Sequence, residues 1–165
     1  MLLGVLSDTH LCAPQGRLRE LLAGPLGEAE VLLHAGDYTG ETVVDYLEHG
    51  DPRPFYGVAG NADPMSVVRR LPATRLLSLA GRRVGLVHGW GSSEGLEDRI
   101  LASLPQGLDL VVYGHSHRPR RAERGETLLV NPGSAFDRRS APACTVALVE
   151  LGCSGMGVRF EEVGC

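Results

Sequence analysis

The sequence predicts one α/β domain built on two β-sheets, and three observations support this prediction. Short apolar runs alternate with amphipathic segments over residues 2–58, a spacing typical of βαβ units and a parallel sheet. The segments after residue 74 are mostly strand-like, which indicates a second, β-rich sheet. No linker, repeat or low-complexity segment interrupts the chain, so residues 1–165 are expected to fold as a single domain.

The elements of the first half follow from apolar runs and helical periodicity. Each predicted strand is an apolar run that stops at a polar residue, as expected for a buried strand. Each predicted helix gathers its apolar residues on one face, as Leu18, Leu21 and Leu22 do. In chain order these elements are strand 2–7, helix 16–23, strand 30–34, helix 40–49 and strand 54–58.

The second half is predicted to contain mostly strands and one helix. Leu96, Ile100 and Leu104 form the apolar stripe of that helix. A glycine-rich stretch at residues 152–157 predicts the turn of a terminal hairpin. In chain order the elements are two strands within residues 74–89, a helix at 93–104, strands at 109–113 and 126–130, and a hairpin over 144–163.

Composition and charge narrow the class of protein. Apolar residues make up 43% of the chain, which is typical of a globular protein. No apolar run approaches the ~20 residues of a membrane span, and the N-terminus resembles no signal peptide, so a cytoplasmic protein without a membrane partner is expected. The net charge of −4 argues against nucleic acid as the main partner. The four cysteines have no zinc-site spacing and are expected to stay reduced, namely Cys12, Cys144, Cys153 and Cys165.

Polar residues able to bind a metal follow nearly every predicted strand, usually beside a glycine. Because ligands of open α/β sheets bind at the carboxyl ends of strands, these side chains are expected to form one site. They come from five strand ends and are Asp8, His10, Asp37, Asn61, His88, His115 and His117. His115 and His117 are expected to face the site together, because side chains two residues apart point the same way in an extended segment.

This set of ligands indicates a catalytic centre with two metal ions. Imidazole, carboxylate and amide oxygen together suit a first-row divalent ion, with Mn preferred and Ni, Fe, Zn and Co as alternatives. Seven ligands exceed the needs of one ion, whereas one shared carboxylate would give two ions four ligands each. Phosphatases and nucleases use such pairs, with a bridging hydroxide as the nucleophile.

The ordered motifs resemble those of the calcineurin-like metallophosphoesterases. They are "DTH" at 8–10, "GD" at 36–37, "GNAD" at 60–63, "HG" at 88–89 and "GHSH" at 114–117. With "NPGS" at 131–134, they look like the compact bacterial and archaeal phosphodiesterase branch, which lacks a cap domain. The resemblance implies a four-layer α/β/β/α sandwich of two mixed sheets flanked by helices, with the dinuclear site at one edge.

The resemblance also implies a role for each ligand. Asp8, His10 and His117 would hold one ion, and Asn61, His88 and His115 the other. Asp37 would bridge both. One position departs from the family, because Ala62 replaces a histidine that many relatives use to protonate the leaving group.

The implied function is hydrolysis of small phosphodiesters by the metal-bridging hydroxide. The alternatives are a phosphomonoesterase with the same site, or a non-catalytic scaffold like a retromer subunit of this fold. The expected partner is a small phosphorylated substrate, and a homodimer or higher homo-oligomer is left open.

Other polar residues have simpler interpretations. Asp63 is expected to cap a helix that begins at Pro64, and His34 to be a hydrogen-bonded core residue. Asn131 could start a turn or shape a loop beside the metals, and both interpretations stay open. The arginines that follow the "GHSH" motif are expected to be solvated, although Arg118 could reach a phosphate. These arginines are at positions 118, 120, 121, 124, 138 and 139.

Overall fold

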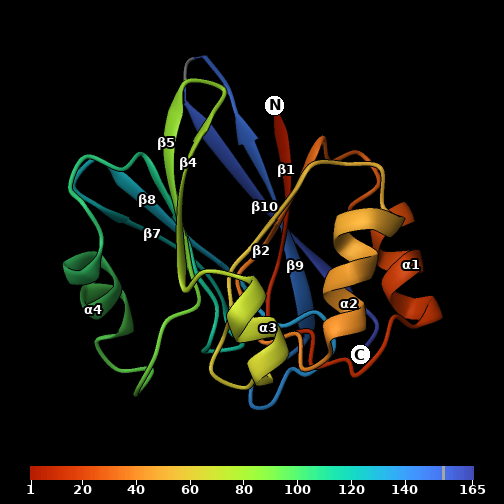
Figure 1. Ribbon diagram of the computed structural model, residues 1–165. Coiled ribbons are helices and arrows are strands. Elements are labelled where there is room, and N and C mark those ends of the chain that lie inside the picture. Colours follow the sequence, from red (N-terminus) through yellow and green to blue (C-terminus); the bar gives the residue numbers. More distant parts are fainter. Residues whose placement is uncertain (154) are drawn as a thin grey trace.

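The computed structural model describes residues 1–153 and 155–165 and contains two five-stranded β-sheets (Figure 1). The first sheet has the order β10-β9-β1-β2-β3, with β1 at Leu2–Leu6, β2 at Val31–His34, β3 at Phe55–Gly57, β9 at Cys144–Leu151 and β10 at Met156–Val163. The second has the order β4-β5-β6-β8-β7, with β4 at Thr74–Leu79, β5 at Arg82–Val87, β6 at Leu110–Val112, β7 at Pro119–Arg124 and β8 at Thr127–Pro132. Three adjacent strands are parallel in each sheet, β1-β2-β3 and β5-β6-β8, so their carboxyl ends share one edge.

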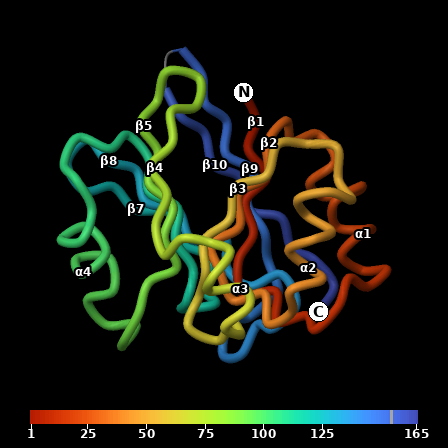
Figure 2. Tube along the Cα trace, in the orientation of Figure 1, coloured from red at the N-terminus to blue at the C-terminus, as the bar shows by residue number. Residues whose placement is uncertain are grey.

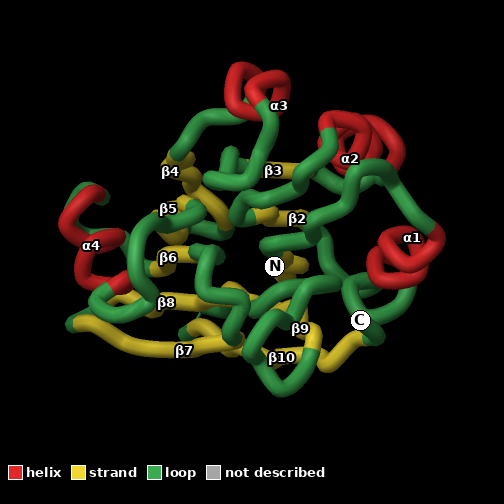
Figure 3. The backbone as a smooth tube through the Cα atoms, turned by 90° about the horizontal axis from the view of Figure 1, so that it is seen from below, coloured by secondary structure: helices red, strands yellow, loops and turns green. Residues whose placement is uncertain are grey.

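The helices cover the outer faces of the two sheets. They are α1 at Gly16–Ala23, α2 at Glu41–Asp45 with a π-helical continuation η1 at Tyr46–Gly50, α3 at Met65–Arg70 and α4 at Leu96–Ser103. Helices α1, α2 and α3 lie on the side of the first sheet, and α4 lies on the side of the second (Figures 1 and 3). The predicted four-layer α/β/β/α sandwich is confirmed.

Three apolar clusters fill the spaces between the four layers. The first joins Leu18 and Val44 of the helices to Leu32 of the first sheet. The second lies between the sheets, and the third packs Ile100 of α4 against Val111. Each fully buried leucine or valine stabilises the fold by about 1.5–3 kcal/mol, so these clusters hold the strand ends in fixed relative positions.

The strand β1 shows why the sequence forms this arrangement. Leu3 and Val5 belong to the cluster between the sheets, whereas Leu6 belongs to the cluster under the helices. Side chains alternate along a strand, so a sheet that is covered on both faces needs apolar residues at nearly every position. In the trace of Figure 2, the N-terminal strand runs at the centre of its sheet, between β2 and β9.

Several predicted elements change in the structure. The helix predicted at 40–49 divides into α2 and η1, where Asp51 N–H donates to Tyr46 O over a wider turn than an α-helix has. The strand β7 is not among the predicted elements; it contains Arg120, Arg121 and Arg124, which are exposed as expected, and it pairs with β8 at the sheet edge. The hairpin of β9 and β10 is confirmed, and Ser154 of its predicted turn lies outside the described residues.

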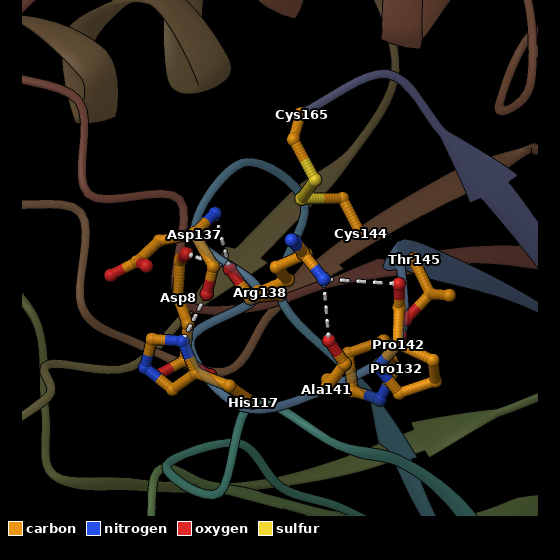
Figure 4. The surroundings of a disulfide bond; sticks show 11 residues. Asp8, His117, Pro132, Asp137, Arg138, Ala141, Pro142, Cys144, Thr145 and Cys165 are labelled. Atoms are coloured by element: carbon orange, nitrogen blue, oxygen red, sulfur yellow. Dashed lines mark hydrogen bonds and ion pairs between the residues drawn. A yellow bond between two sulfur atoms is a disulfide. The ribbon is translucent and has the colours of Figure 1, made fainter.

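The prediction that all four cysteines stay reduced is wrong for two of them. A disulfide joins Cys144 at the start of β9 to Cys165, with a Cα–Cα separation of 5.5 Å (Figure 4). The pairing of Cys144 with Val163 in the β9–β10 ladder brings the end of the chain beside Cys144. Cys12 and Cys153 are exposed and free. Among the described residues, no helix is long and apolar enough to cross a membrane.

Candidate metal centre

Loops at the carboxyl edge of the parallel strands bring the seven predicted ligands together. Figure 3 views the molecule from the end at which these loops lie. Asp8 and His10 follow β1, Asp37 follows β2 and Asn61 follows β3 of the first sheet; His88 follows β5, and His115 and His117 follow β6 of the second. The centre is therefore built by both sheets.

The first group of side chains consists of Asp8, His10 and His117. Their potential ligand atoms all lie within 4.8 Å of one another. The Nε2 atoms of His10 and His117 are 3.4 Å apart, and His117 Nε2 lies 3.2 Å from Asp8 Oδ1. Asp8 Oδ1 is buried and faces His117 Nε2, so this anionic oxygen needs a positive charge beside it, either an imidazolium or a metal cation.

The second group is formed by Asp37, Asn61, His88 and His115. His88 Nε2 lies 3.3 Å from Asp37 Oδ2 and 3.2 Å from Asn61 Oδ1. Asn61 Oδ1 is also 2.9 Å from His115 Nδ1. Asp8, Asp37 and His88 form a further set with ligand atoms within 4.8 Å, which connects the two groups.

Backbone carbonyls set the tautomers of three of these histidines. His88 Nδ1 lies 2.6 Å from Ala35 O, His115 Nε2 lies 2.7 Å from Gly91 O, and His117 Nδ1 contacts Asp137 O. Because a carbonyl only accepts, each of these ring nitrogens carries the proton. In the neutral ring, the opposite nitrogen presents its lone pair to the centre, which is the state required of a metal ligand. The donor set therefore fits divalent cations.

The carboxylates of the centre are held in the ionised form. Burial raises the pKa of Asp8, but the contact with His117 and the positive charge of His88 outweigh burial and lower it. Burial likewise raises the pKa of Asp37, but the hydrogen bond with His88 and its charge bring that pKa to about 2. The carboxylates of Asp8 and Asp37 are therefore both ionised, and available to a cation, over the physiological range of pH.

Two of the histidines are stabilised as cations in the protein without metal. Burial lowers the pKa of His88, yet the hydrogen bond with Asp37 and the charge of Asp8 raise it overall. Burial lowers the pKa of His117, yet the hydrogen bond with Asp8 and the charge of Asp8 raise it overall. Binding of a cation must displace these protons.

The backbone around the ligands takes the left-handed conformation at five positions. The φ angles are positive at Asp8, His10, Asp37, His115 and His117. The prediction that His115 and His117 lie in an extended segment is therefore wrong, because their φ angles are +70° and +57°. Two successive bends direct these side chains to different places, His115 beside Asn61 and His117 beside Asp8.

The predicted role of Asp63 as a helix cap is also wrong. Helix α3 has Pro64 at its N-cap position and no side-chain cap. The Asp63 carboxylate instead accepts four backbone hydrogen bonds, from Asp37 and Gly60 through Oδ2 and from Tyr38 and Thr39 through Oδ1. Asp63 thus joins the loop after β2 to the loop after β3, and thereby positions both Asp37 and Asn61.

Asn131 shapes the loop that carries His115 and His117. Its Nδ2 donates to Gly114 O at 2.7 Å, and its Oδ1 accepts from Gly133 N–H at 2.9 Å. Ser134 of the same "NPGS" segment donates to Asp8 O. The sequence predicts that Asn131 either starts a turn or shapes a loop beside the metals. Its contact with Gly133 closes a turn, and its contact with Gly114 favours the second interpretation.

Three further polar residues, His34, His49 and Arg118, make no hydrogen bond to the seven ligand side chains in the part of the chain that the structure describes. His49 is exposed at the end of η1. Arg118 is exposed, and its Nη2 lies 3.1 Å from Ser140 Oγ. His34 is fully buried, as predicted for a core residue. His34 Nδ1 accepts from Gly36 N–H at 3.1 Å, so Nε2 carries the proton and donates to Thr9 Oγ1.

Protonation of His34 should couple the stability of the fold to pH. Burial lowers the pKa of His34 to about 3, against 6.5 for an ordinary histidine. As the pH falls through this window, the unfolded chain gains a proton that the folded chain does not, so stability is lost. The free energy of unfolding of His34→Gln is expected to fall less steeply than that of the wild type, by about 1.4 kcal/mol per pH unit near pH ~5.

Urea unfolding in the presence of a chelator would measure this slope without changes in metal occupancy. His49→Gln removes an exposed imidazole and should keep the slope of the wild type. Equal slopes for His34→Gln and the wild type would contradict the assignment of a neutral His34 in the folded state.

A comparison with known protein families matches most of the chain to one family. A family model described as the calcineurin-like phosphoesterase superfamily domain matches residues 1–153. A protein of Methanothermobacter thermautotrophicus named probable metallophosphoesterase is 34% identical over 152 residues, which cover 91% of this chain and 87% of that protein. A protein of the same description from Methanocaldococcus jannaschii is 31% identical over 137 residues, which cover 81% and 68% of the two chains.

Solved structures of similar fold include proteins of different kinds. An archaeal phosphodiesterase superposes with a TM-score of 0.75 at 21% identity, covering 99% of this chain and 100% of that one. Vps29 of Entamoeba histolytica, solved with Zn²⁺, superposes with a TM-score of 0.69 at 26% identity, covering 99% and 98%. At 21% identity, the similarity to the archaeal phosphodiesterase shows a shared fold and nothing more.

Proposed function

The chain belongs to the calcineurin-like phosphoesterase superfamily, and on this premise we propose that it is a dinuclear metal-dependent phosphodiesterase acting on small phosphodiesters. The observation that supports metal-dependent chemistry is the convergence of histidine ring nitrogens and carboxylate oxygens at one edge of two sheets. Asp8 Oδ1, buried beside His117 Nε2, is an oxygen that a metal cation would hold once the proton on that nitrogen is displaced.

Asp37 is the carboxylate best placed to serve two ions. Its Oδ1 accepts from Ala62 N–H, while Oδ2 lies 3.3 Å from His88 Nε2 and 3.8 Å from His10 Nε2. Oδ2 therefore contacts a histidine of each group. Asp8 offers one free oxygen only, because its Oδ2 accepts from Ser7 Oγ and His115 N–H. We therefore assign one ion to Asp8, His10 and His117, the other to Asn61, His88 and His115, and the bridge to Asp37.

Two divalent ions held by these residues, Mn²⁺ in our preferred assignment, would supply Lewis-acid charge for the phosphate and would lower the pKa of bound water. Hydrolysis forms a bond from the oxygen of water to phosphorus and breaks the bond from phosphorus to one alcohol, which leaves with a proton. Residue 62 offers no side chain that could supply this proton, and its backbone N–H holds Asp37 instead. Diesters with weakly basic leaving groups should therefore react fastest.

A cavity beside the centre has room for an organic group of the substrate. It has a volume of about 190 Å³ and includes Asn61 and His88 in its lining. A phosphodiester carries two organic groups, so one can occupy the cavity while the other leaves as the alcohol.

Hydrolysis of matched aryl esters would test this proposal. We expect the protein to hydrolyse bis(p-nitrophenyl) phosphate faster than p-nitrophenyl phosphate when Mn²⁺ or Ni²⁺ is present, and neither ester after treatment with a chelator. A monoester rate equal to or above the diester rate would establish the phosphomonoesterase instead.

A scaffold without catalysis is the alternative from another class of protein. The complete set of seven ligands disfavours a purely structural role. Elemental analysis separates the two possibilities, because the proposed enzyme should contain two equivalents of metal after dialysis against Mn²⁺. Failure to retain any metal, together with the absence of turnover, would favour the scaffold.

A further inference from the structure

We propose that the cavity beside Asn61 and His88 binds the nucleobase of a nucleoside phosphodiester, with Trp90 as its stacking partner. This inference rests on the proposed function and names the class of substrate. Trp90 is the single tryptophan of the chain, and 45% of its surface is exposed. It lines the cavity two residues after His88.

The chemistry of the lining indicates a flat, neutral occupant. Small residues make up much of the lining, namely Ala59, Gly60, Ala73 and Gly89. The lining contains no carboxylate, guanidinium or ammonium group among the described residues, so nothing there would hold a second phosphate. The volume of about 190 Å³ is below the roughly 300–1,000 Å³ of pockets for drug-sized ligands, which suits one ring system.

Hydrogen bonds to the backbone hold the loop that carries Trp90. Arg99 of α4 donates to Trp90 O through Nη2 at 3.1 Å and to Glu94 O through Nη1 at 2.7 Å. Gly91 O accepts from His115, a proposed ligand of the centre. The backbone of the loop that carries Trp90 is thus attached both to α4 and to the centre, so ordering this backbone costs little when a ring stacks on the side chain.

Stacking on an aromatic side chain is the general way in which proteins hold a base without reading its identity. Tryptophan offers the largest ring face of any residue, and base–aromatic stacking weakens about tenfold or more when the side chain is truncated to alanine. Thr74, which also lines the cavity, supplies a hydroxyl for a ring nitrogen or oxygen.

Fluorescence of the single tryptophan tests occupancy without reference to catalysis. Adenosine 5′-monophosphate is expected to quench Trp90 emission saturably, whereas ribose 5-phosphate, which lacks the base, should leave it unchanged. The titration is made on the Mn²⁺-loaded protein and again in chelator. Equal responses to the two compounds, or no response to either, would overturn the proposal.

Kinetics with matched substrates test the same point. Trp90→Ala should raise KM for 2′,3′-cyclic AMP by about tenfold or more, and should change kcat/KM for glycerophosphoethanolamine, a diester without a ring, by less than about twofold. Trp90→Phe should recover most of the loss. Leu76→Ala is the matched control, because Leu76 is exposed on β4 and lies outside the cavity lining.

The two proposals fail in distinguishable ways. If Trp90→Ala alters both substrates equally, the base site is wrong and the phosphodiesterase stands. If the wild type hydrolyses no diester, the phosphodiesterase is wrong, and the fluorescence titration alone decides whether the cavity binds a base.

Discussion

Replacement of Asp37 by asparagine is expected to abolish turnover and to empty both halves of the centre. Asparagine keeps an oxygen that can accept from Ala62 N–H but lacks the charge that Asp37 Oδ2 presents between His10 and His88. The variant should fold, lose diester hydrolysis by roughly a thousandfold or more, and retain less than one equivalent of Mn²⁺ after dialysis.

Single histidine variants provide the comparison for this result. His117→Gln should remove the metal equivalent beside Asp8, and His115→Gln the equivalent beside Asn61. Elemental analysis and assay of the purified variants would measure both effects. An Asp37→Asn protein that keeps one full equivalent of Mn²⁺ would show that this residue does not bridge.

Replacement of Asp63 by asparagine should impair the centre from a distance. The new amide NH₂ cannot accept a hydrogen bond, so two of the four backbone N–H groups now held by Asp63 lose their partner. We expect a loss of about 1–3 kcal/mol in the free energy of unfolding and a loss of about 10- to 100-fold in metal affinity.

The matched control for Asp63 is Asp98→Asn, which removes an exposed carboxylate of α4. Chemical denaturation and metal titration should leave this variant within about 0.5 kcal/mol of the wild type. If Asp63→Asn binds Mn²⁺ as tightly as the wild type, the loop after β2 holds its conformation without Asp63.

The position of the centre could be predicted from sequence because it depends on local patterns. Each apolar run identifies a strand, and the polar residue that follows it must lie at the strand's end. The parallel order then brings Asp8, Asp37 and His88 to one edge. The apolar layers follow from the same runs, since the inner strands β1, β2, β6, β8 and β9 are buried on both faces.

Features that depend on tertiary contacts could not be predicted. Asp63 precedes a proline in a pattern typical of a helix cap, and only the approach of the loop after β2 gives its carboxylate other donors. β7 is an edge strand of mostly exposed residues, so it lacks an apolar run. The disulfide depends on the register of β9 and β10, which aligns Cys144 with Val163 two residues before Cys165.

The left-handed backbone at five proposed ligands has a consequence for how such a protein can evolve. Non-glycine residues in this conformation cost roughly 1 kcal/mol each, and together they approach the lower end of the 5–15 kcal/mol that typically separates folded from unfolded states. Glycine at these positions would relieve the cost and remove the ligand. Selection for hydrolysis and selection for thermodynamic robustness therefore favour different residues at the same positions. A descendant released from catalysis would gain stability by losing its ligands, while the sandwich that carries them stayed intact.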